Sequence, residues 1–130
     1  MHLQLIMEES YLKKETYKII GLCMEVYKIL GKGHSENVYG DALEFEFKSN
    51  NVVYEREKKY NIEYKEIILP RCYFSDFTVY NKIILEIKAI QQLTNSEIKQ
   101  TLNYLAASKN KIGLLINFGE DSLSYRRIIL

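Results

Sequence analysis

The sequence predicts an α/β fold in which a mixed β-sheet is flanked by helices. Two early segments place apolar residues at helical spacing, and several later segments are short, apolar and rich in β-branched residues. The strand–helix–strand order over residues 83–118 is that of a right-handed crossover between parallel strands. The resulting order is α-α-β-β-β-β-α-β-β. A chain of 130 residues has room for one domain, which we expect over residues 11–130 after an N-terminal tail of residues 1–10.

The composition is that of an ordinary globular protein, with 47% hydrophobic and 27% charged residues. The net charge of +1 attracts no polyanion by itself, so a nucleic-acid partner would need locally concentrated Lys and Arg. No stretch reaches the roughly 18 apolar residues of a membrane span, and residues 1–9 lack the pattern of a signal peptide. Cys23 and Cys72 lie in apolar surroundings and are expected to be reduced core residues. We therefore expect a soluble, intracellular (cytoplasmic) protein without membrane association.

Two amphipathic helices are expected in the first 50 residues. Residues 11–30 form the first, which would end at Gly31-Lys32-Gly33 because glycine adopts the left-handed cap conformation. The second is expected from Ser35, its N-cap, to Ser49. Glu36 falls in the first turn of this helix, where the helix dipole favours an acid, so the helix alone accounts for its presence.

The next segment is expected to form short strands. Residues 52–64 alternate charged and apolar side chains and would form one strand or two, with a polar face outward. Lys65-Glu66 predicts a turn and residues 67–69 a short strand. Pro70-Arg71 predicts a break, because proline cannot donate to a sheet ladder.

Residues 73–88 predict a β-hairpin whose register decides where two acids lie. A three-residue loop at Tyr80-Asn81-Lys82 would place Asp76 directly opposite Glu86 on one face. A two-residue loop at Tyr80-Asn81 would instead pair Ser75 with Glu86 and send Asp76 to the other face. We expect the register that unites the acids, since asparagine tolerates the left-handed conformation that the longer loop requires.

Charged residues in apolar strands need a physical reason. Two adjacent carboxylates repel unless a proton or a cation lies between them, and Mg²⁺ takes one or two carboxylates together with waters. Lys88 lies on the same strand face as Glu86 and could stabilise negative charge on a phosphate or lower the pKa of an attacking water. The alternative is a structural acid–lysine pair at a sheet edge, or a buried ion network of Glu36, Glu86 and Lys88.

A third helix and two strands complete the chain. Thr94-Asn95-Ser96-Glu97 matches a capping box, and the helix it opens would run to Ser108. Gln100 and Tyr104 are four residues apart on it and can reach the same object. Residues 111–118 predict a central strand covered on both faces, and residues 124–130 a last strand.

The series Asp76, Glu86-Ile87-Lys88 and Gln100-x-x-x-Tyr104 resembles the core of the PD-(D/E)XK nuclease superfamily, with the Gln-x-x-x-Tyr helix of its RecB-like branch. The segment G-K-G-H-S-E-N-V-Y, residues 31–39, and the closing strand of residues 113–118 are more closely similar to the small GxxExxron family of that superfamily. The resemblance covers roughly residues 20–130. In one departure, Ser75 precedes the first acid and no proline is nearby.

The resemblance implies a restriction-endonuclease-like core and a metal-dependent site. Asp76, Glu86 and the main-chain carbonyl of Ile87 would hold Mg²⁺ or Mn²⁺, and Lys88 would be the catalytic lysine. Glu36 would face the site as an extra acid, and Gln100 and Tyr104 would line it from the third helix.

Three functions are weighed from the sequence. The first is a Mg²⁺-dependent endo- or exodeoxyribonuclease that hydrolyses DNA phosphodiester bonds. The second is a catalytically silent module of the same fold that binds nucleic acid or a protein partner, and the third is an oligomerising structural protein. A homodimer is expected, since a small domain needs a second copy to present two sites. Candidate contacts to the DNA backbone are Arg56, Lys58, Lys59, Arg71, Lys99, Arg126 and Arg127.

Overall fold

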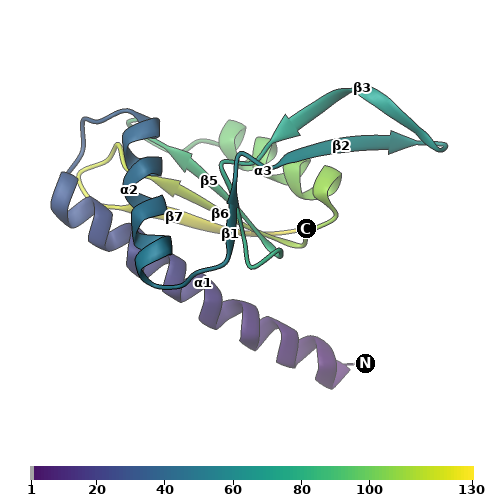
Figure 1. Cartoon of the computed structure of the whole chain (residues 1–130), viewed down its shortest axis with the longest axis horizontal. Helices are drawn as coiled ribbons and strands as arrows, with labels where there is room; N and C mark the ends of the chain where they lie inside the picture. The colour runs from purple at the N-terminus through teal and green to yellow at the C-terminus, as the bar shows by residue number, and fades with distance from the viewer. Residues whose placement is uncertain (1) are drawn as a thin grey trace.

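The computed structural model describes the backbone of residues 2–130 and the side chains of residues 12–130. It confirms the mixed α/β fold, in which helices flank a mixed sheet (Figure 1). The elements in chain order are α1 (His2–Leu30), α2 (Glu36–Ser49), β1 (Tyr54–Arg56), β2 (Lys59–Tyr64), β3 (Ile67–Phe74), β4 (Phe77–Val79), β5 (Ile83–Lys88), α3 (Asn95–Ser108), β6 (Ile112–Asn117) and β7 (Ser124–Ile129).

Five strands form the main sheet in the order β1-β4-β5-β6-β7. β5 and β6 are parallel and are joined through α3, whereas the other neighbours are antiparallel. Helices α1 and α2 pack on one face of this sheet and α3 on the other (Figure 1). The two strands at the centre are covered on both sides, as the near-continuous apolar sequence of residues 111–118 predicts.

Strand β5 shows the alternation that a two-residue period requires. Ile83, Leu85 and Ile87 join the core under α1 and α2, while Ile84 joins the smaller core under α3. Glu86 belongs to the same alternate set as Ile84 and is buried, with 4% of its surface exposed. One face of the strand is thus core, and the other carries a buried acid.

The helix ends follow their local sequence signals. Gly31 and Gly33 after α1 adopt positive φ angles of 66° and 109°. The Ser35 side chain caps α2 by accepting a hydrogen bond from the Val38 N–H. Thr94 and Glu97 form the predicted reciprocal capping box of α3. The caps set the first residue of α2 and of α3, and so the positions on these helices from which the Glu36 and Gln100 side chains project.

The hairpin of β4 and β5 has the register that brings the acids together. Val79 pairs with Ile83 and Phe77 with Leu85, so a three-residue loop connects the strands. Tyr80 and Asn81 take the left-handed φ angles of 55° and 58° that such a loop needs. The two-residue alternative is therefore wrong.

Two details of the preceding strands differ from expectation. Residues 52–64 form two strands, which is one of the two arrangements expected, but the strands lie in different sheets and five strands rather than four precede α3. Pro70 does not end a strand, because β3 continues through it to Phe74. The ladder of β2 and β3 has a bulge there: the register passes from Asn61 opposite Cys72 to Glu63 opposite Ile68. The bulge accommodates a residue that has no N–H to donate.

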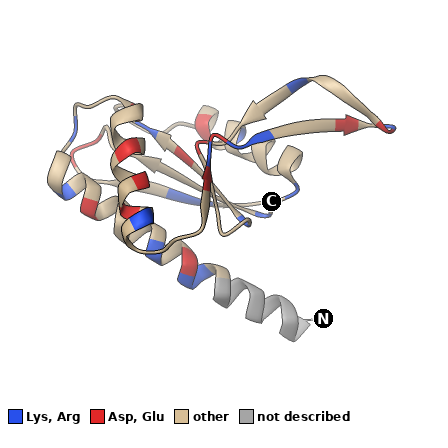
Figure 2. Cartoon of the chain, in the orientation of Figure 1, with Lys and Arg blue, Asp and Glu red and all other residues tan. Residues whose placement is uncertain are grey.

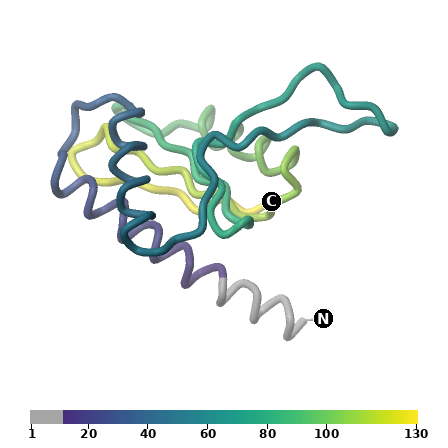
Figure 3. Tube along the Cα trace, in the orientation of Figure 1, coloured from purple at the N-terminus to yellow at the C-terminus, as the bar shows by residue number. Residues whose placement is uncertain are grey.

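Strands β2 and β3 form a separate two-stranded sheet, here called the arm (residues 59–74). The arm projects away from the main sheet and returns to it just before Asp76 (Figure 1; Figure 3). Cys72 lies on the arm and is exposed, so the expectation that it is a core residue is wrong. The apolar residues next to Cys72 in the sequence belong to the arm and not to the main sheet, whereas Cys23 on α1 is buried as expected.

Helix α1 begins at His2, so the helix expected over residues 11–30 starts earlier and its backbone takes in residues 2–10 of the expected N-terminal tail. The side chains of residues 1–11 lie outside the described part of the chain, and the extent of the domain stays a prediction. Within the described chain, no helix has the length and apolar character needed to cross a bilayer.

Candidate active site

Asp76 and Glu86 lie side by side and are locked together through the backbone. The Asp76 N–H donates to Glu86 Oε2 at 2.9 Å, and the Ile87 N–H donates to Asp76 Oδ2 at 2.7 Å. Asp76 stands at a bend between β3 and β4, directly before Phe77, the first residue of β4, and Glu86 stands on β5. Among the described residues, no donor makes a hydrogen bond to the second oxygen of either carboxylate, Asp76 Oδ1 or Glu86 Oε1. The pair therefore presents two open carboxylate oxygens.

The electrostatics of this pair are unfavourable without a cation. Burial, and after it the negative charge of Asp76, raises the pKa of Glu86 to about 8, while the Asp76 N–H and Lys88 act in the opposite direction. The pKa of Asp76 is also raised, because burial outweighs the stabilising Ile87 N–H and the charges of Lys88 and Arg56. Two acids held together at this depth are suited to sharing a proton or a divalent ion.

Lys88 and the third helix close one side of the pair. The Lys88 ammonium donates to Gln100 Oε1 at 3.2 Å, which links the end of β5 to the exposed face of α3. Tyr104 lies one turn further along α3. Its pKa is raised first by burial and then by the negative charges of Glu86 and Asp76, so its hydroxyl lies within the field of both acids. Gln100 and Tyr104 thus reach the same region, as their four-residue spacing predicts.

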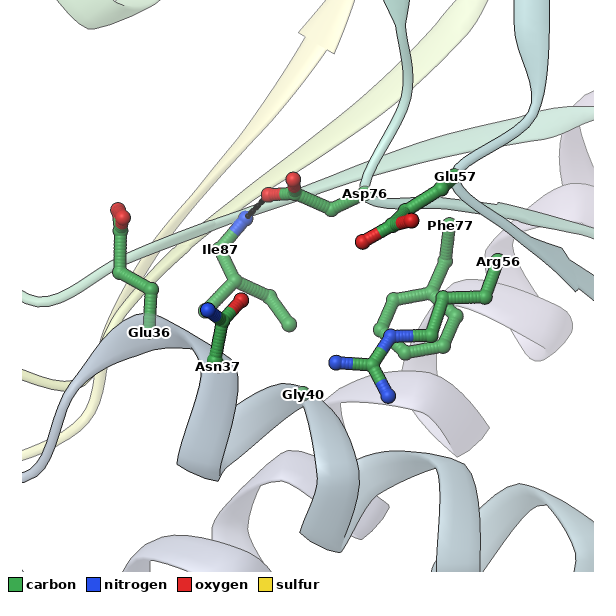
Figure 4. A pocket seen from close by; sticks show the side chains of 8 residues that line it. All are labelled: Glu36, Asn37, Gly40, Arg56, Glu57, Asp76, Phe77 and Ile87. Atoms are coloured by element: carbon green, nitrogen blue, oxygen red, sulfur yellow. Dashed lines mark hydrogen bonds between the residues drawn. The ribbon is translucent and has the colours of Figure 1, made fainter.

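Glu36 approaches the acids from the other side of the sheet edge. The pKa of Glu36 is raised, mainly because the carboxylate is partly buried; the charge of Lys88 acts to lower this pKa and the charge of Asp76 acts to raise it. The Glu36 carboxylate therefore lies close enough to interact electrostatically with both side chains. A cavity of about 90 Å³ lies between α2 and Asp76 and is lined by Glu36, Asn37, Gly40, Arg56, Glu57, Asp76, Phe77 and Ile87 (Figure 4). Elements far apart in the sequence therefore converge on one hollow.

The loop before Glu36 is held in place by a buried aromatic side chain. The Tyr39 hydroxyl donates to the Gly31 carbonyl at 2.5 Å and accepts from the His34 N–H at 3.3 Å. The Tyr39 ring stacks on Phe118, with the ring centroids 4.4 Å apart. The first turn of α2, and with it Glu36, is thereby anchored to the end of β6.

The basic side chains expected to contact DNA differ in whether they already form ion pairs within the protein. Arg56 borders the cavity but pairs with Asp41 at 2.7 Å and Glu44 at 3.2 Å, and its guanidinium lies over the Phe77 ring. Lys58 pairs with Glu55 at 3.4 Å. Lys59, Arg71 and Lys99 are exposed and make no ion pair among the described side chains. Lys and Arg are distributed over several elements in this view, with no single basic stripe (Figure 2).

Two residues beside the acids were not singled out by their sequence. Glu57 has a left-handed φ of 54°, and its N–H donates to the Asp76 carbonyl at 3.0 Å. Its carboxylate points toward Asp76 and Arg56 across the cavity (Figure 4). Phe74 is exposed and borders a neighbouring hollow with Asp76. Both flank Asp76 only because the chain bends between β3 and β4, and no local sequence signal marked that bend.

Comparison with known proteins agrees with this geometry. The model of the PD-(D/E)XK nuclease superfamily matches residues 13–128, nearly the whole chain. The chain belongs to the PD-(D/E)XK nuclease superfamily. The roles that the resemblance implies for Asp76, Glu86 and Lys88 stay predictions.

A solved structure shares the fold. The crystal structure of SSO0001 superposes with a TM-score of 0.58 over 72% of this chain, at 20% sequence identity. This chain spans about half of that structure, since the match covers 48% of it. A search of curated proteins found no match. At this identity the likeness establishes the fold alone.

Proposed function

We propose that this superfamily member is a metal-dependent nuclease that hydrolyses phosphodiester bonds in DNA. The observation that carries the proposal is the reciprocal backbone lock between Asp76 and Glu86, which holds one half-buried and one buried carboxylate together against their mutual repulsion. A fold gains nothing in stability from such a pair, and raised pKa values cluster at functional sites. The wider resemblance to the GxxExxron family, through residues 31–39, belongs to the same proposal.

The donor set fits a hard divalent cation such as Mg²⁺ or Mn²⁺. Asp76 and Glu86 supply two carboxylates, and the Ile87 carbonyl would add a neutral oxygen. In the described part of the chain no group of three or more His, Cys, Asp and Glu side chains is arranged to hold a metal. Mg²⁺ keeps several waters and often uses only one or two carboxylates, so the two acids and the carbonyl would suffice to hold it. When bound, the cation would supply an activated water and neutralise charge on the phosphate.

The chain's own residues would position the reaction. Attack of a water oxygen on phosphorus, departure of one ester oxygen and its protonation leave a phosphate monoester and a free hydroxyl. Lys88, oriented by Gln100, would stabilise the negative charge that develops on the phosphate oxygens. Glu36 lies on the opposite side of the acids and is available to hold a water or its proton. Tyr104 would line the site from α3.

The test is metal-dependent cleavage by the purified protein and two variants. Wild type is expected to cut DNA with Mg²⁺ or Mn²⁺ but not with EDTA. Glu86→Ala and Lys88→Ala should each reduce the cleavage rate by roughly 10²-fold or more, because each removes a group that acts on developing charge. Lys111→Ala, an exposed lysine outside the site, is the matched control and should cut normally.

Calorimetry separates the metal site from the chemistry. Mg²⁺ or Mn²⁺ titrated into wild type should bind, and Asp76→Asn should lose that binding. Pure protein that binds no metal and cuts no nucleic acid would contradict the nuclease proposal. It would favour a silent binding module, which the ion-paired state of Arg56 also permits.

A further inference from the structure

The base of the arm carries an exposed aromatic side chain beside the candidate active site. Phe74 is the last residue of β3 and is 55% exposed, although phenylalanine is ordinarily buried. It borders a hollow of about 370 Å³ together with Glu57, Ser75 and Asp76. An exposed ring therefore lies two residues from one of the two acids proposed to hold the metal.

The opposite face of the arm explains why this ring is held in place. Tyr73, the preceding residue, points to the other face and stacks on Tyr104 of α3, with centroids 4.0 Å apart and ring planes 4° from parallel. The Tyr73 hydroxyl donates to the Tyr104 carbonyl. Tyr60, the cross-strand partner of Tyr73, extends the stack with its centroid 5.3 Å from that of Tyr73. These contacts fix the base of the arm against α3 and leave Phe74 facing outward.

The cross-strand neighbour of Phe74 is a cation. Lys59 lies directly opposite Phe74 in the ladder, so both side chains project from the same face of the arm. Lys59 is exposed and makes no ion pair among the described residues. An aromatic face beside a free ammonium is the combination that binds a nucleotide whose base is unstacked, because the ring meets the base and the ammonium meets the phosphate.

We propose that Phe74 stacks on an unpaired base of the DNA next to the phosphate at Asp76 and Glu86, and that Lys59 binds the phosphate of that nucleotide. This rests on the proposed nuclease function and narrows its substrate to single-stranded DNA or DNA with unpaired ends. A base inside a duplex has both of its faces covered by neighbours. The proposal therefore requires a strand that is already open, or one that opens at the site.

The experiment measures binding and cleavage separately. A short single strand carrying 2-aminopurine, a base whose fluorescence is quenched by stacking, is titrated with protein in EDTA and in Mg²⁺, and the matching duplex is titrated alongside. Wild type is expected to bind the single strand more tightly and to change its fluorescence. Phe74→Ala should weaken single-strand binding about tenfold and abolish that change, while duplex binding alters little.

Phe45→Ala is the matched control. Phe45 is likewise an exposed phenylalanine, 67% exposed, but it lies on α2 and lines none of the hollows beside the acids. This variant should behave like wild type. Because both side chains are exposed, both variants should fold, and thermal unfolding verifies this. Lys59→Ala should weaken binding and reduce the dependence of the logarithm of the binding constant on the logarithm of salt concentration by about one.

The outcomes distinguish this inference from the function on which it rests. Metal-dependent cleavage with equal single-strand binding by wild type and Phe74→Ala would overturn the stacking role and leave the nuclease proposal intact. Base stacking that depends on Phe74, observed without any cleavage, would support the stacking role of Phe74 and contradict the nuclease proposal. Wild-type protein that neither quenches 2-aminopurine nor prefers the single strand would overturn the inference.

Discussion

Arg56 and Asp76 border the same cavity, and the groups of charged side chains to which they belong are assembled in opposite ways. Arg56 is surrounded by opposite charge, with Asp41 and Glu44 in direct contact and the Phe77 ring beneath it. Asp76 and Glu86 are like charges placed together and largely buried, and burial raises the pKa of both. The first arrangement satisfies its charges within the protein. The second arrangement leaves negative charge that is neutralised only when a cation or a proton binds between the two acids.

The difference separates structural charge from charge held for a ligand. A basic residue at the edge of a nuclease site invites a role in phosphate binding, yet the guanidinium of Arg56 is already occupied. It also fills the space beside Gly40, where an added Cβ would come within 2.6 Å of Arg56 Nη2. The acids have their positions fixed by backbone hydrogen bonds, while their outward oxygens stay open. Proximity to the cavity is thus a poorer guide to function than unsatisfied charge.

Glu86→Gln should give the largest change in stability, and in an unusual direction. The folded-state pKa of Glu86 is raised from 4.5 to about 8, so the folded protein holds a proton that the unfolded chain has released in this range. The stability of the metal-free wild type should therefore fall as the pH rises from about 4.5 to about 8. The variant should be more stable than wild type at pH 8, its stability should depend less on pH, and it should lack the proposed cleavage activity.

Urea unfolding in EDTA at pH 5 and pH 8 measures this effect. Glu63→Gln, on the exposed arm, is the control and should leave the pH dependence unchanged. Saturating Mg²⁺ should restore stability to wild type at pH 8 but not to the variant. If the free energy of unfolding of wild type instead rose from pH 5 to pH 8, relative to that of Glu86→Gln, the pKa of Glu86 would not be raised in the folded protein.

Arg56→Ala should have a smaller effect and the ordinary sign. It removes two charged hydrogen bonds and the contact with Phe77, and should lower the free energy of unfolding by about 1–3 kcal/mol. Arg126→Ala, at an exposed arginine on β7, should change it by less than about 0.5 kcal/mol. If Arg56→Ala kept full stability but lost DNA binding, Arg56 would act on the substrate and the distinction drawn here would fail.

Lys58→Ala should have the smallest effect on stability. Its partner Glu55 has a side chain that is 55% exposed, and ion pairs of this kind contribute little. We expect a change of less than about 0.5 kcal/mol in urea unfolding. A larger loss would mean that its contact with the Tyr60 ring supports the base of the arm.

The sequence predicted the acids and their neighbours well because short-range rules control them. The two-residue strand period places Glu86 and Lys88 on one face, and the three-residue loop aligns Asp76 with Glu86. The capping box begins α3 so that Gln100 reaches Lys88. Each step depends on residues close together in the chain.

The sequence did not predict the arm or the neutralisation of Arg56, because both depend on distant contacts. Asp41 and Glu44 belong to α2 and meet Arg56 only when β1 packs beside that helix. The apolar residues 67–69 predicted a short strand but not its surroundings, and Ile67 and Ile68 are 57% and 62% exposed. Whether an apolar strand is covered depends on the elements around it, which the strand's own pattern does not contain.

The bend at Ser75-Asp76 has a consequence for how this protein can change over generations. The arm leaves the main sheet at Lys58 and returns at Ser75, whose N–H donates to the Lys58 carbonyl at 3.0 Å. At the far end of the arm, around the Lys65-Glu66 turn, insertion, deletion or replacement of residues should leave the pairing of β1, β4 and β5 unchanged, so that the acids keep their positions. If the arm binds the substrate as proposed above, natural selection can alter that binding independently of the proposed chemistry at Asp76 and Glu86.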